Sequence, residues 1–355
     1  MQRTSKFCQK LAGSLLAGLL LAACAGASQP MLGPATAGTV RAQRLTQAEA
    51  ATLKRYFVGS AADVQLPLKG PGLLLSGGGG HVYPGLQWLI DTVRGCSNCA
   101  QTLDVVVVRA TDDTSYLELM QALQGVDSVE ILAFSGRAAA DSAAVARTLA
   151  LAEVVYFAGG DQCKYVTYFK GTALDQALKS LYARGGGIAG TSAGLAIQGD
   201  AVYDACSGSV NTQQALSDPF HPEISFTHAF LAWPMMADTL TDTHFAQRDR
   251  MGRLMSFLTR IQAERKRPMR GLAVDEETAL AVDGRGHARV FGNHNTYIVH
   301  TEANPSAVLP GQPLNAPGYR IWRLTPGMGF DLSRRDQPGA YRVEVRNGKL
   351  SQNPY

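Results

Sequence analysis

Five continuous apolar runs, each followed by a turn and a helical stretch, dominate residues 70–199. The runs are rich in Val, Leu and Ile without polar alternation, and they cover 72–76, 103–108, 129–135, 153–160 and 187–190. Between them, apolar residues recur at helical spacing in 84–94, 114–124, 141–152 and 172–184. Continuous apolar strands are typical of parallel sheets that are buried on both faces. The pattern therefore predicts an α/β fold in which a mostly parallel sheet carries helices on both faces.

The second half of the chain has a different pattern. Residues 201–245 indicate loops and short strands, and residues 248–265 indicate a helix. Two hairpins are expected, one around Asp283 and Gly284 and one at Asn347–Gly348, a dipeptide that favours two-residue turns. We therefore expect antiparallel strands to extend the parallel sheet in the C-terminal part.

The N-terminus has the composition of an export signal. Basic residues open the chain, and an apolar run of 13 residues leads to Cys24, as in a secretory signal peptide. The stretch "LAAC" resembles a bacterial lipobox, which predicts a periplasmic or cell-surface lipoprotein of a bacterium, held at the membrane by a lipid on Cys24. The alternative is cleavage nearby followed by release. The expected organisation is a signal peptide at 1–23, a tether at 24–44, and an α/β domain with a C-terminal β extension at 45–355.

The charge of the mature chain is close to balance. The full sequence has 33 Lys and Arg against 29 Asp and Glu. Removing residues 1–23 takes away 3 basic and no acidic residues, which leaves 30 against 29 and a net charge of +1. This balance does not indicate nucleic-acid binding, which usually depends on a basic surface.

Four cysteines follow Cys24. Export to an oxidising compartment favours disulfides, and four cysteines allow three sets of pairs. We favour Cys96 with Cys99 and Cys163 with Cys206, and the other sets stay open. A zinc site needs a second close pair or a Cys/His group at ligand spacing. Neither is present, so we expect no metal, and we expect no cofactor.

Glycine-rich turns follow three of the predicted strands, at 77–80, 159–160 and 190–194. Open α/β sheets bind ligands at the carboxyl ends of their strands, so these turns should meet at one site. The last turn, "GTSAG", is a G-x-S-x-G sequence between a strand and a helix, the context in which this motif presents a nucleophile. Its small neighbours let Ser192 project from the sheet, and the amides that follow favour an oxyanion. The alternative is a chance glycine-rich loop.

Four segments carry a resemblance to a known family. They are "FAGGDQCKYV" at 157–166, "GTSAGLAIQG" at 190–199, "TDTHFAQRDRMGRLMSFL" at 241–258 and "GLAVDEETALAV" at 271–282. Together they resemble the cyanophycinases and their relatives, which are serine peptidases related to peptidase E. The resemblance implies a flavodoxin-like fold similar to the class I glutamine amidotransferases. It also implies a peptide or polymer substrate with aspartyl or arginyl units, and a homodimer, since members of this family are often dimers.

The resemblance also implies roles for individual residues. Ser192 would attack the scissile carbonyl, and His244 would take its proton and later protonate the leaving amine. The backbone amides of Gly160 and Ala193 would bind the oxyanion. The positions that match the substrate pocket of cyanophycinases are Gln162, Asp242, Arg248, Arg250 and Arg253. Without the resemblance, these arginines indicate a solvated helix face; in a pocket, their planar donors suit a carboxylate.

The acid that orients His244 has three candidates, Asp218, Glu223 and Glu276. Relatives place it either between the serine and the histidine or after the histidine. Glu276 is preferred because its surroundings match well and it follows a predicted strand. The other interpretations are a turn residue before Pro219 for Asp218, and a solvated hairpin charge for Glu276.

Three departures limit what the resemblance implies about the substrate. Thr243 stands where cyanophycinases usually carry Gln, the loop "SGGGGHVY" lacks a common acidic residue, and residues 201–240 match poorly. The leading prediction is an exported serine peptidase that cuts isopeptide-type aspartyl bonds in cyanophycin or β-aspartyl peptides. Two alternatives stay open: an α/β-hydrolase-type esterase that uses Asp218, and a lipoprotein that binds a ligand in the same pocket without turnover.

Overall fold

The computed structural model describes residues 45–302 and 308–355, which lie in one compact unit, Val40–Tyr355. The predicted signal peptide, Cys24 and the tether lie outside the described residues. Within the described residues, no helix combines the length and the apolar character needed to cross a membrane.

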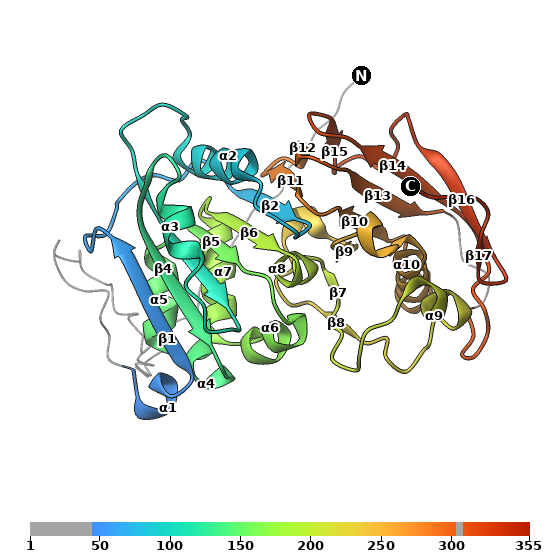
Figure 1. Ribbon diagram of the computed structural model, residues 1–355, viewed down its shortest axis with the longest axis horizontal. Helices are drawn as coiled ribbons and strands as arrows, with labels where there is room; N and C mark the ends of the chain where they lie inside the picture. The colour runs from blue at the N-terminus through green and yellow to red at the C-terminus, as the bar shows by residue number, and fades with distance from the viewer. Residues whose placement is uncertain (1–44, 303–307) are drawn as a thin grey trace, which may run out of the picture. The chain divides into compact units, whose positions relative to one another are not determined.

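The strands of the described residues form two mixed sheets, one of nine strands and one of eight (Figure 1). The centre of the nine-stranded sheet is parallel, in the spatial order β4 (Val126–Phe134), β3 (Leu103–Arg109), β5 (Val154–Phe157), β6 (Gly187–Thr191) and β2 (Gly72–Ser76). These are the five strands that the apolar runs predict. Antiparallel strands flank them: β1 (Leu53–Gly59) at one edge, and β11 (Thr278–Asp283), β12 (His287–Gly292) and β15 (Gly329–Asp331) at the other.

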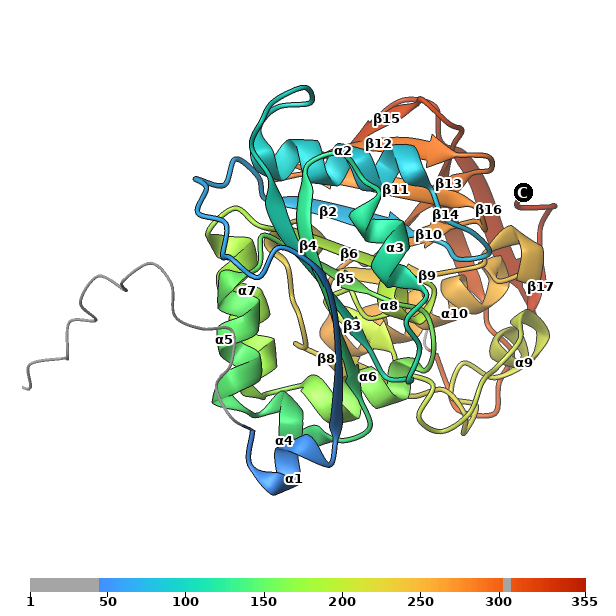
Figure 2. The same cartoon turned by 60° about the vertical axis from the view of Figure 1, so that its left-hand side comes forward.

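Helices cover both faces of this sheet, as the apolar runs predict. Val105 and Val107 of β3 pack with α2 (Tyr83–Arg94) and α3 (Tyr116–Gln121) on one face. Val106 and Val108 point the other way, to the core that includes α5 (Ala143–Leu151), α6 (Gln162–Phe169) and α7 (Ala173–Ala183). Figure 2 shows α5 and α7 side by side, with the short helices α1 (Gln47–Ala50) and α4 (Arg137–Ala140) next to each other below them.

All eight strands of the second sheet lie after residue 200. Its order is β17 (Lys349–Leu350), β16 (Tyr341–Arg346), β14 (Ala316–Leu324), β13 (Thr296–Thr301), β10 (Arg270–Val274), β9 (Thr239–Asp242), β7 (Ala201–Tyr203) and β8 (Phe226–His228). Helix α10 (Met251–Arg265) packs against β10 and β13, and α9 (Thr212–Ser217) packs against α10. The predicted turn at Asn347–Gly348 joins β16 to β17, and both residues have positive φ.

The α/β class is confirmed, but the prediction of a mostly parallel sheet is wrong, because both sheets are large and mixed. The three residues between β10 and β11 show why. At Asp275–Glu277 the chain leaves one sheet for the other: β10 pairs with β9 and β13, whereas β11 pairs with β2 and β12. Local patterns predict that a stretch is a strand, but its pairing partner depends on distant parts of the chain.

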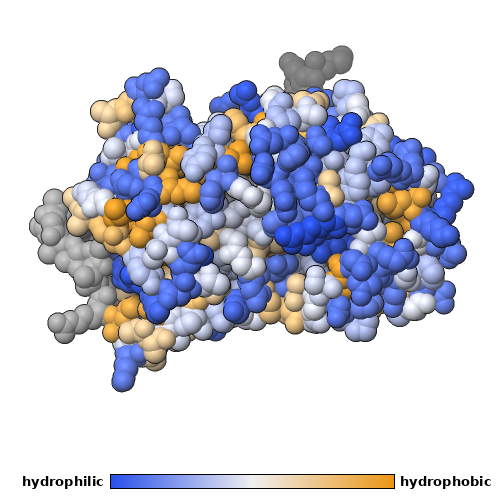
Figure 3. Space-filling view, viewed as in Figure 1, coloured by the Kyte–Doolittle hydropathy of each residue, from blue (hydrophilic) through white to orange (hydrophobic). Residues whose placement is uncertain are grey.

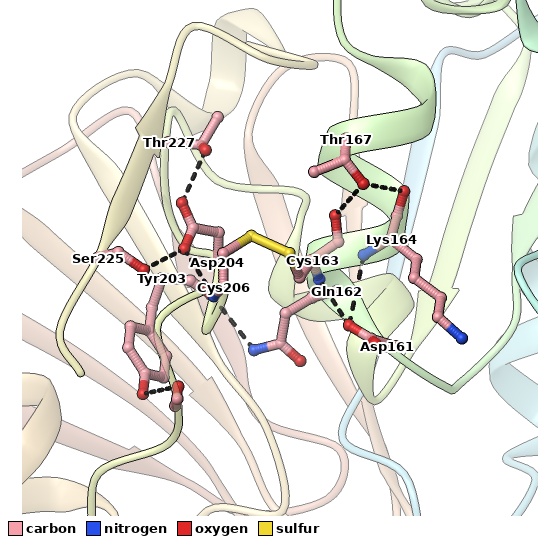
Figure 4. The surroundings of a disulfide bond; sticks show 11 residues. Asp161, Gln162, Cys163, Lys164, Thr167, Tyr203, Asp204, Cys206, Ser225 and Thr227 are labelled. Carbon is pink, nitrogen blue, oxygen red and sulfur yellow. Dashed lines mark hydrogen bonds between the residues drawn. A yellow bond between two sulfur atoms is a disulfide. The ribbon is translucent and has the colours of Figure 1, made fainter. Parts of the chain in front are cut away.

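Both favoured disulfides, Cys96–Cys99 and Cys163–Cys206, are confirmed. The first closes a short turn after α2. The second joins the start of α6 to the segment that follows β7 (Figure 4).

The buried carboxyl group of Glu153, directly before β5, makes the stability of the fold depend on pH. Burial raises the pKa of Glu153 to about 8, and the Asp104 carboxylate adds to this rise. Its Oε2 accepts the Asp104 N–H at 2.7 Å. Above the unfolded value of 4.5, the folded chain keeps a proton that the unfolded chain has lost, so stability falls as pH rises toward 8. Glu153→Gln keeps an acceptor and removes this dependence.

We expect the wild-type protein to lose roughly 3 kcal/mol more than Glu153→Gln between pH 6 and pH 9, since one pKa unit is worth about 1.4 kcal/mol. Urea unfolding at both pH values measures the difference. The exposed Glu118→Gln variant is the control and should follow the wild type. Equal pH dependence in wild type and Glu153→Gln would contradict the assignment.

Candidate active site

Ser192 lies on a sharp turn between β6 and the short helix α8 (Ala193–Ala196). Its φ of 53° and ψ of −118° are rare for a residue with a side chain, and such strain is concentrated at functional sites. The two glycines of the motif permit the turn. A Cβ at Gly190 would lie 2.2 Å from the Gly194 carbonyl oxygen, and one at Gly194 would lie 2.3 Å from the Phe157 carbonyl oxygen. The turn therefore matches the arrangement that the G-x-S-x-G pattern predicts.

The structure brings Ser192, His244 and Glu276 together. The Ser192 Oγ lies 2.7 Å from His244 Nε2, and His244 Nδ1 lies 2.6 Å from Glu276 Oε1. His244 follows β9, and Glu276 lies in the turn between β10 and β11. With the Nδ1 proton donated to the carboxylate, Nε2 is free to accept the serine hydroxyl proton.

The other two candidate acids lie elsewhere. Asp218 is the C-cap residue of α9, and its Oδ1 accepts the backbone N–H groups of Phe220 and Gly311. The Glu223 side chain packs against Gly208. Among the described residues, Glu276 is the carboxylate that hydrogen-bonds to His244.

The glycine loop after β2 packs directly against His244 and Glu276. Gly78 has a φ of 97°, and a Cβ there would lie 2.3 Å from His244 Cε1. A Cβ at Gly79 would lie 2.6 Å from Glu276 Cβ. The His244 N–H donates to the Gly77 carbonyl oxygen at 2.9 Å. Sequence reasoning placed this loop near the site but missed its role, which is to let the imidazole and the carboxylate pack directly on backbone.

Asp275 is a second residue that sequence reasoning missed, although it lies within the "GLAVDEETALAV" segment. It is fully buried, and its carboxylate accepts the N–H of Ala246 at 2.8 Å and that of Asn295 at 3.1 Å. Gln247 Oε1 also accepts the N–H of Glu276 at 3.0 Å. These bonds tie the turn that carries His244 to the turn that carries Glu276.

The surroundings of His244 favour the neutral form of its imidazole. Burial lowers the pKa of His244, and the nearby Arg248 and Arg250 charges lower it further, while the hydrogen bond to Glu276 opposes the shift. A neutral imidazole can act as a general base.

A cavity of about 290 Å³ opens beside Ser192. Of the residues predicted for catalysis, oxyanion binding and substrate binding, all except Glu276 line it, namely Gly160, Gln162, Ser192, Ala193, Asp242, His244, Arg248, Arg250 and Arg253. The cavity is also lined by residues that sequence reasoning did not identify, including Asp161, Tyr203, Ala205, Ser209 and Thr241. Three of the latter, Tyr203, Ala205 and Ser209, come from residues 201–240, the part of the chain where the resemblance is weakest.

The arginines around the cavity differ in their partners. Arg253 is buried and binds both carboxylate oxygens of Asp242, at 2.9 and 2.5 Å, so these two charges compensate each other. Arg250 donates to the Thr243 carbonyl oxygen at 2.8 Å and lies 3.6 Å from Asp242, and burial lowers its pKa to about 10. Arg248 is half exposed. In Figure 3, strongly hydrophilic residues gather over the region between α8 and α10. Three arginines line the cavity against two aspartates, Asp161 and Asp242, and this excess of positive charge favours an anionic ligand.

The predicted oxyanion donors also lie at the cavity. Ala193 begins α8, and the amides of a first helical turn have no partner within the helix. Gly160 has a φ of 144°, and a Cβ there would meet nothing within 4 Å, so this residue faces open space. Its neighbour Gly159 approaches Ser192, since a Cβ there would lie 3.4 Å from Ser192 Cβ. An amide of each turn can therefore lie near a group bound to Ser192 Oγ.

Comparisons with known proteins found similar sequences and a similar fold. Residues 73–290, more than half of the chain, match Peptidase family S51. The chain is 29% identical over 236 residues to a protein named cyanophycinase from Trichormus variabilis, covering 64% of this chain and 73% of that one. It is 27% identical over 213 residues to a cyanophycinase from Synechococcus elongatus, covering 59% and 62%. A crystal structure of a peptidase from an acI-B1 Actinobacterium has a similar fold, with a TM-score of 0.50 and 18% identity over 75% of this chain and 98% of that one.

Proposed function

Since the chain belongs to peptidase family S51 and is a serine-type peptidase, we propose that it hydrolyses isopeptide-type aspartyl bonds through an acyl-enzyme on Ser192. The substrates in this proposal are cyanophycin or β-aspartyl peptides. The observation that carries it is the hydrogen-bonded series Ser192–His244–Glu276 at the edge of an arginine-lined cavity.

The proposed reaction has two halves. In the first, His244 Nε2 takes the Ser192 proton as Oγ attacks the scissile carbonyl, and the amides of Gly160 and Ala193 donate to the oxyanion. The imidazolium, held by Glu276, then protonates the leaving amine, and an acyl ester remains on Ser192. In the second half, His244 activates a water molecule that releases the aspartyl product and restores the hydroxyl.

The cavity supports an acidic group in the substrate. Arg253 binds both oxygens of Asp242, whereas Arg250 and Arg248 lie farther from their carboxylate partners, 3.6 Å from Asp242 and 3.9 Å from Glu276, so these two are the cations best placed for a ligand. A guanidinium donates two parallel hydrogen bonds to a carboxylate, which suits the free carboxylate beside an isopeptide-type aspartyl bond. The relatives named cyanophycinase support the same substrate class.

We also propose that the protein is exported and anchored as a lipoprotein through Cys24. The "LAAC" stretch supports this proposal, as do the two disulfides, because disulfides persist mainly in oxidising compartments. Mass spectrometry of the mature N-terminus from bacterial membranes tests it: a lipid-modified Cys24 is expected, and an intact residue 1 would contradict it.

The proposed activity is tested with a substrate panel. Purified protein is incubated with cyanophycin, β-aspartyl dipeptides, α-aspartyl dipeptides and short acyl esters, and products are separated by chromatography. Release of aspartyl products is expected from the first two. Cleavage of the esters alone would favour an esterase, and tight binding of aspartyl peptides without product would favour a binding protein.

Arg250 is expected to govern recognition of the substrate carboxylate. Arg250→Gln should raise KM for a β-aspartyl dipeptide by roughly 10- to 100-fold with a smaller change in kcat, because a charge-assisted hydrogen bond is worth about 1.5–3 kcal/mol. For an analogue with an amide in place of that carboxylate, Arg250→Gln should change KM little. Steady-state kinetics with both compounds measure the difference, and the exposed Arg346→Gln variant is the control. Equal losses on both compounds would contradict the role.

The pH profile reports the state of His244. Because burial lowers its pKa below the usual 6.5, the acid limb of kcat/KM should have its midpoint below pH 6.5. Activity is lost only when pH falls through this lowered value, since the protonated imidazole cannot accept the serine proton. A midpoint at or above 6.5 would contradict this assignment.

A further inference from the structure

The Cys163–Cys206 disulfide joins two parts of the chain that both line the cavity (Figure 4). Cys163 lies in the first turn of α6, directly after Asp161 and Gln162, which line one part of the cavity. Cys206 lies between Ala205 and Ser209, which line another part. The disulfide therefore crosses from the layer of the nine-stranded sheet to the end of a strand of the eight-stranded sheet.

The α6 side of this link is firmly anchored. Tyr165 and Phe169 of α6 are fully buried in the core of the nine-stranded sheet. The Tyr165 hydroxyl donates to the Ala158 carbonyl oxygen at 2.7 Å. The Asp161 side chain caps the helix by accepting the Cys163 N–H at 2.9 Å. The position of Cys163 is thus set by the core and does not depend on Cys206.

The other side, residues 204–209, has no helix or strand and is half exposed. Its first residue, Asp204, is buried and holds the Cys206 N–H at 3.0 Å and the Thr227 hydroxyl at 2.8 Å. Beyond Asp204 the segment has few contacts with the rest of the fold: the Gly208 carbonyl oxygen accepts the Tyr203 hydroxyl at 3.2 Å, and the half-buried Glu223 side chain packs against Gly208. A hydrogen bond from Gln162 Nε2 to the Tyr203 carbonyl oxygen, at 3.3 Å, reaches the strand end but not this segment.

We propose that the Cys163–Cys206 disulfide is a positioning element of the substrate pocket, which holds segment 204–209 in place as a wall opposite the Gly160 turn. This inference rests on the proposed function. A wall that is fixed before binding lowers the entropic cost of binding the substrate. Opening the disulfide should therefore weaken substrate binding. The bonds among Ser192, His244 and Glu276 run through turns that contain neither cysteine, so they should persist.

The disulfide is accessible to a reductant because Cys206 is exposed. A dithiol such as dithiothreitol attacks the disulfide through its thiolate and then closes on itself. Two electrons and two protons pass to the protein, which gains thiols at 163 and 206, while the reagent becomes a cyclic disulfide. The same reagent also reduces Cys96–Cys99, so variants must separate the two.

The test compares two double variants, Cys163→Ser/Cys206→Ser and the control Cys96→Ser/Cys99→Ser, by steady-state kinetics on a β-aspartyl dipeptide. In the first variant KM should rise about tenfold with kcat changed less than about twofold, because a tenfold change in binding corresponds to about 1.4 kcal/mol, similar to the cost of ordering one or two side chains. The control should match the wild type. Dithiothreitol should raise KM in the wild type and the control, but not in Cys163→Ser/Cys206→Ser.

Hydrogen exchange provides a readout that needs no substrate. Amides of 204–209 should exchange faster after reduction, while amides of α6 and of the Ser192 turn keep their rates. An unchanged KM in a cleaving enzyme without the disulfide, or unchanged exchange in 204–209, would overturn the inference. If the wild type cleaves no aspartyl peptide, the proposed function fails, and exchange still decides whether the disulfide holds the wall. If Cys163→Ser/Cys206→Ser does not fold, the reduced wild type and the reduced control carry both measurements.

Discussion

Ser192→Ala is expected to lower kcat on a β-aspartyl dipeptide by about 10⁴- to 10⁶-fold, the range found when the nucleophile of a serine peptidase is removed. The alanine has no oxygen to form the acyl ester, while the Gly160 and Ala193 amides and the cavity remain. KM should change little, because Ser192 Oγ supplies few contacts to a substrate held by arginines. Steady-state kinetics measure the loss.

The fold should survive this substitution. Alanine and serine share a Cβ, so the φ of 53° at position 192 costs both residues about the same. Thermal unfolding should therefore differ little from the wild type, and a fluorophosphonate should label the wild type but not the variant. Ser180→Ala, on the exposed side of α7, is the matched control for both measurements. Hydrolysis that persists in a folded Ser192→Ala protein would refute the proposed mechanism.

The features that sequence reasoning predicted well are local. The strand-to-helix turn at Ser192 needs only its own glycines and the strand before it, so G-x-S-x-G between an apolar run and a helical stretch was sufficient. The five parallel strands were predicted for the same reason, since a strand buried on both faces has an apolar run of its own. The hairpin turn at Asn347–Gly348 depends on two residues that tolerate positive φ.

The features that it missed depend on contacts between distant residues. Gly78 and Gly79 are needed because His244 and Glu276, far along the chain, pack against them. Asp275 matters because the N–H groups of Ala246 and Asn295 meet its carboxylate. The division into two sheets at Asp275–Glu277 has the same origin. No local pattern records which partner a strand or a glycine will meet, so these features follow only from the folded chain.

The choice among three acids shows this limit most clearly. The sequence favours Glu276 by the match of its motif and by its place after a predicted strand. The structure separates the candidates by distance: Glu276 Oε1 lies 2.6 Å from His244 Nδ1, whereas the Asp218 carboxylate accepts the N–H groups of Phe220 and Gly311. Glu276→Gln should therefore lower kcat by about 10⁴-fold, as when a triad acid becomes an amide. The amide N–H can donate to Nδ1, which places the imidazole proton on Nε2, where it faces the serine hydroxyl and blocks proton acceptance.

Glu277→Gln is the matched control, because Glu277 lies in the same turn but its carboxylate accepts from Asn293 Nδ2 at 2.9 Å instead of reaching His244. It should retain nearly full kcat, as should Glu223→Gln. The residual activity of Glu276→Gln should also have its acid limb at lower pH than the wild type, since the Glu276 carboxylate raises the pKa of His244. If Glu223→Gln loses activity while Glu276→Gln retains it, Glu223 and not Glu276 orients His244, and the proposed site is contradicted. A shift of the midpoint of the acid limb to higher pH in Glu276→Gln would show that another carboxylate supports the imidazole.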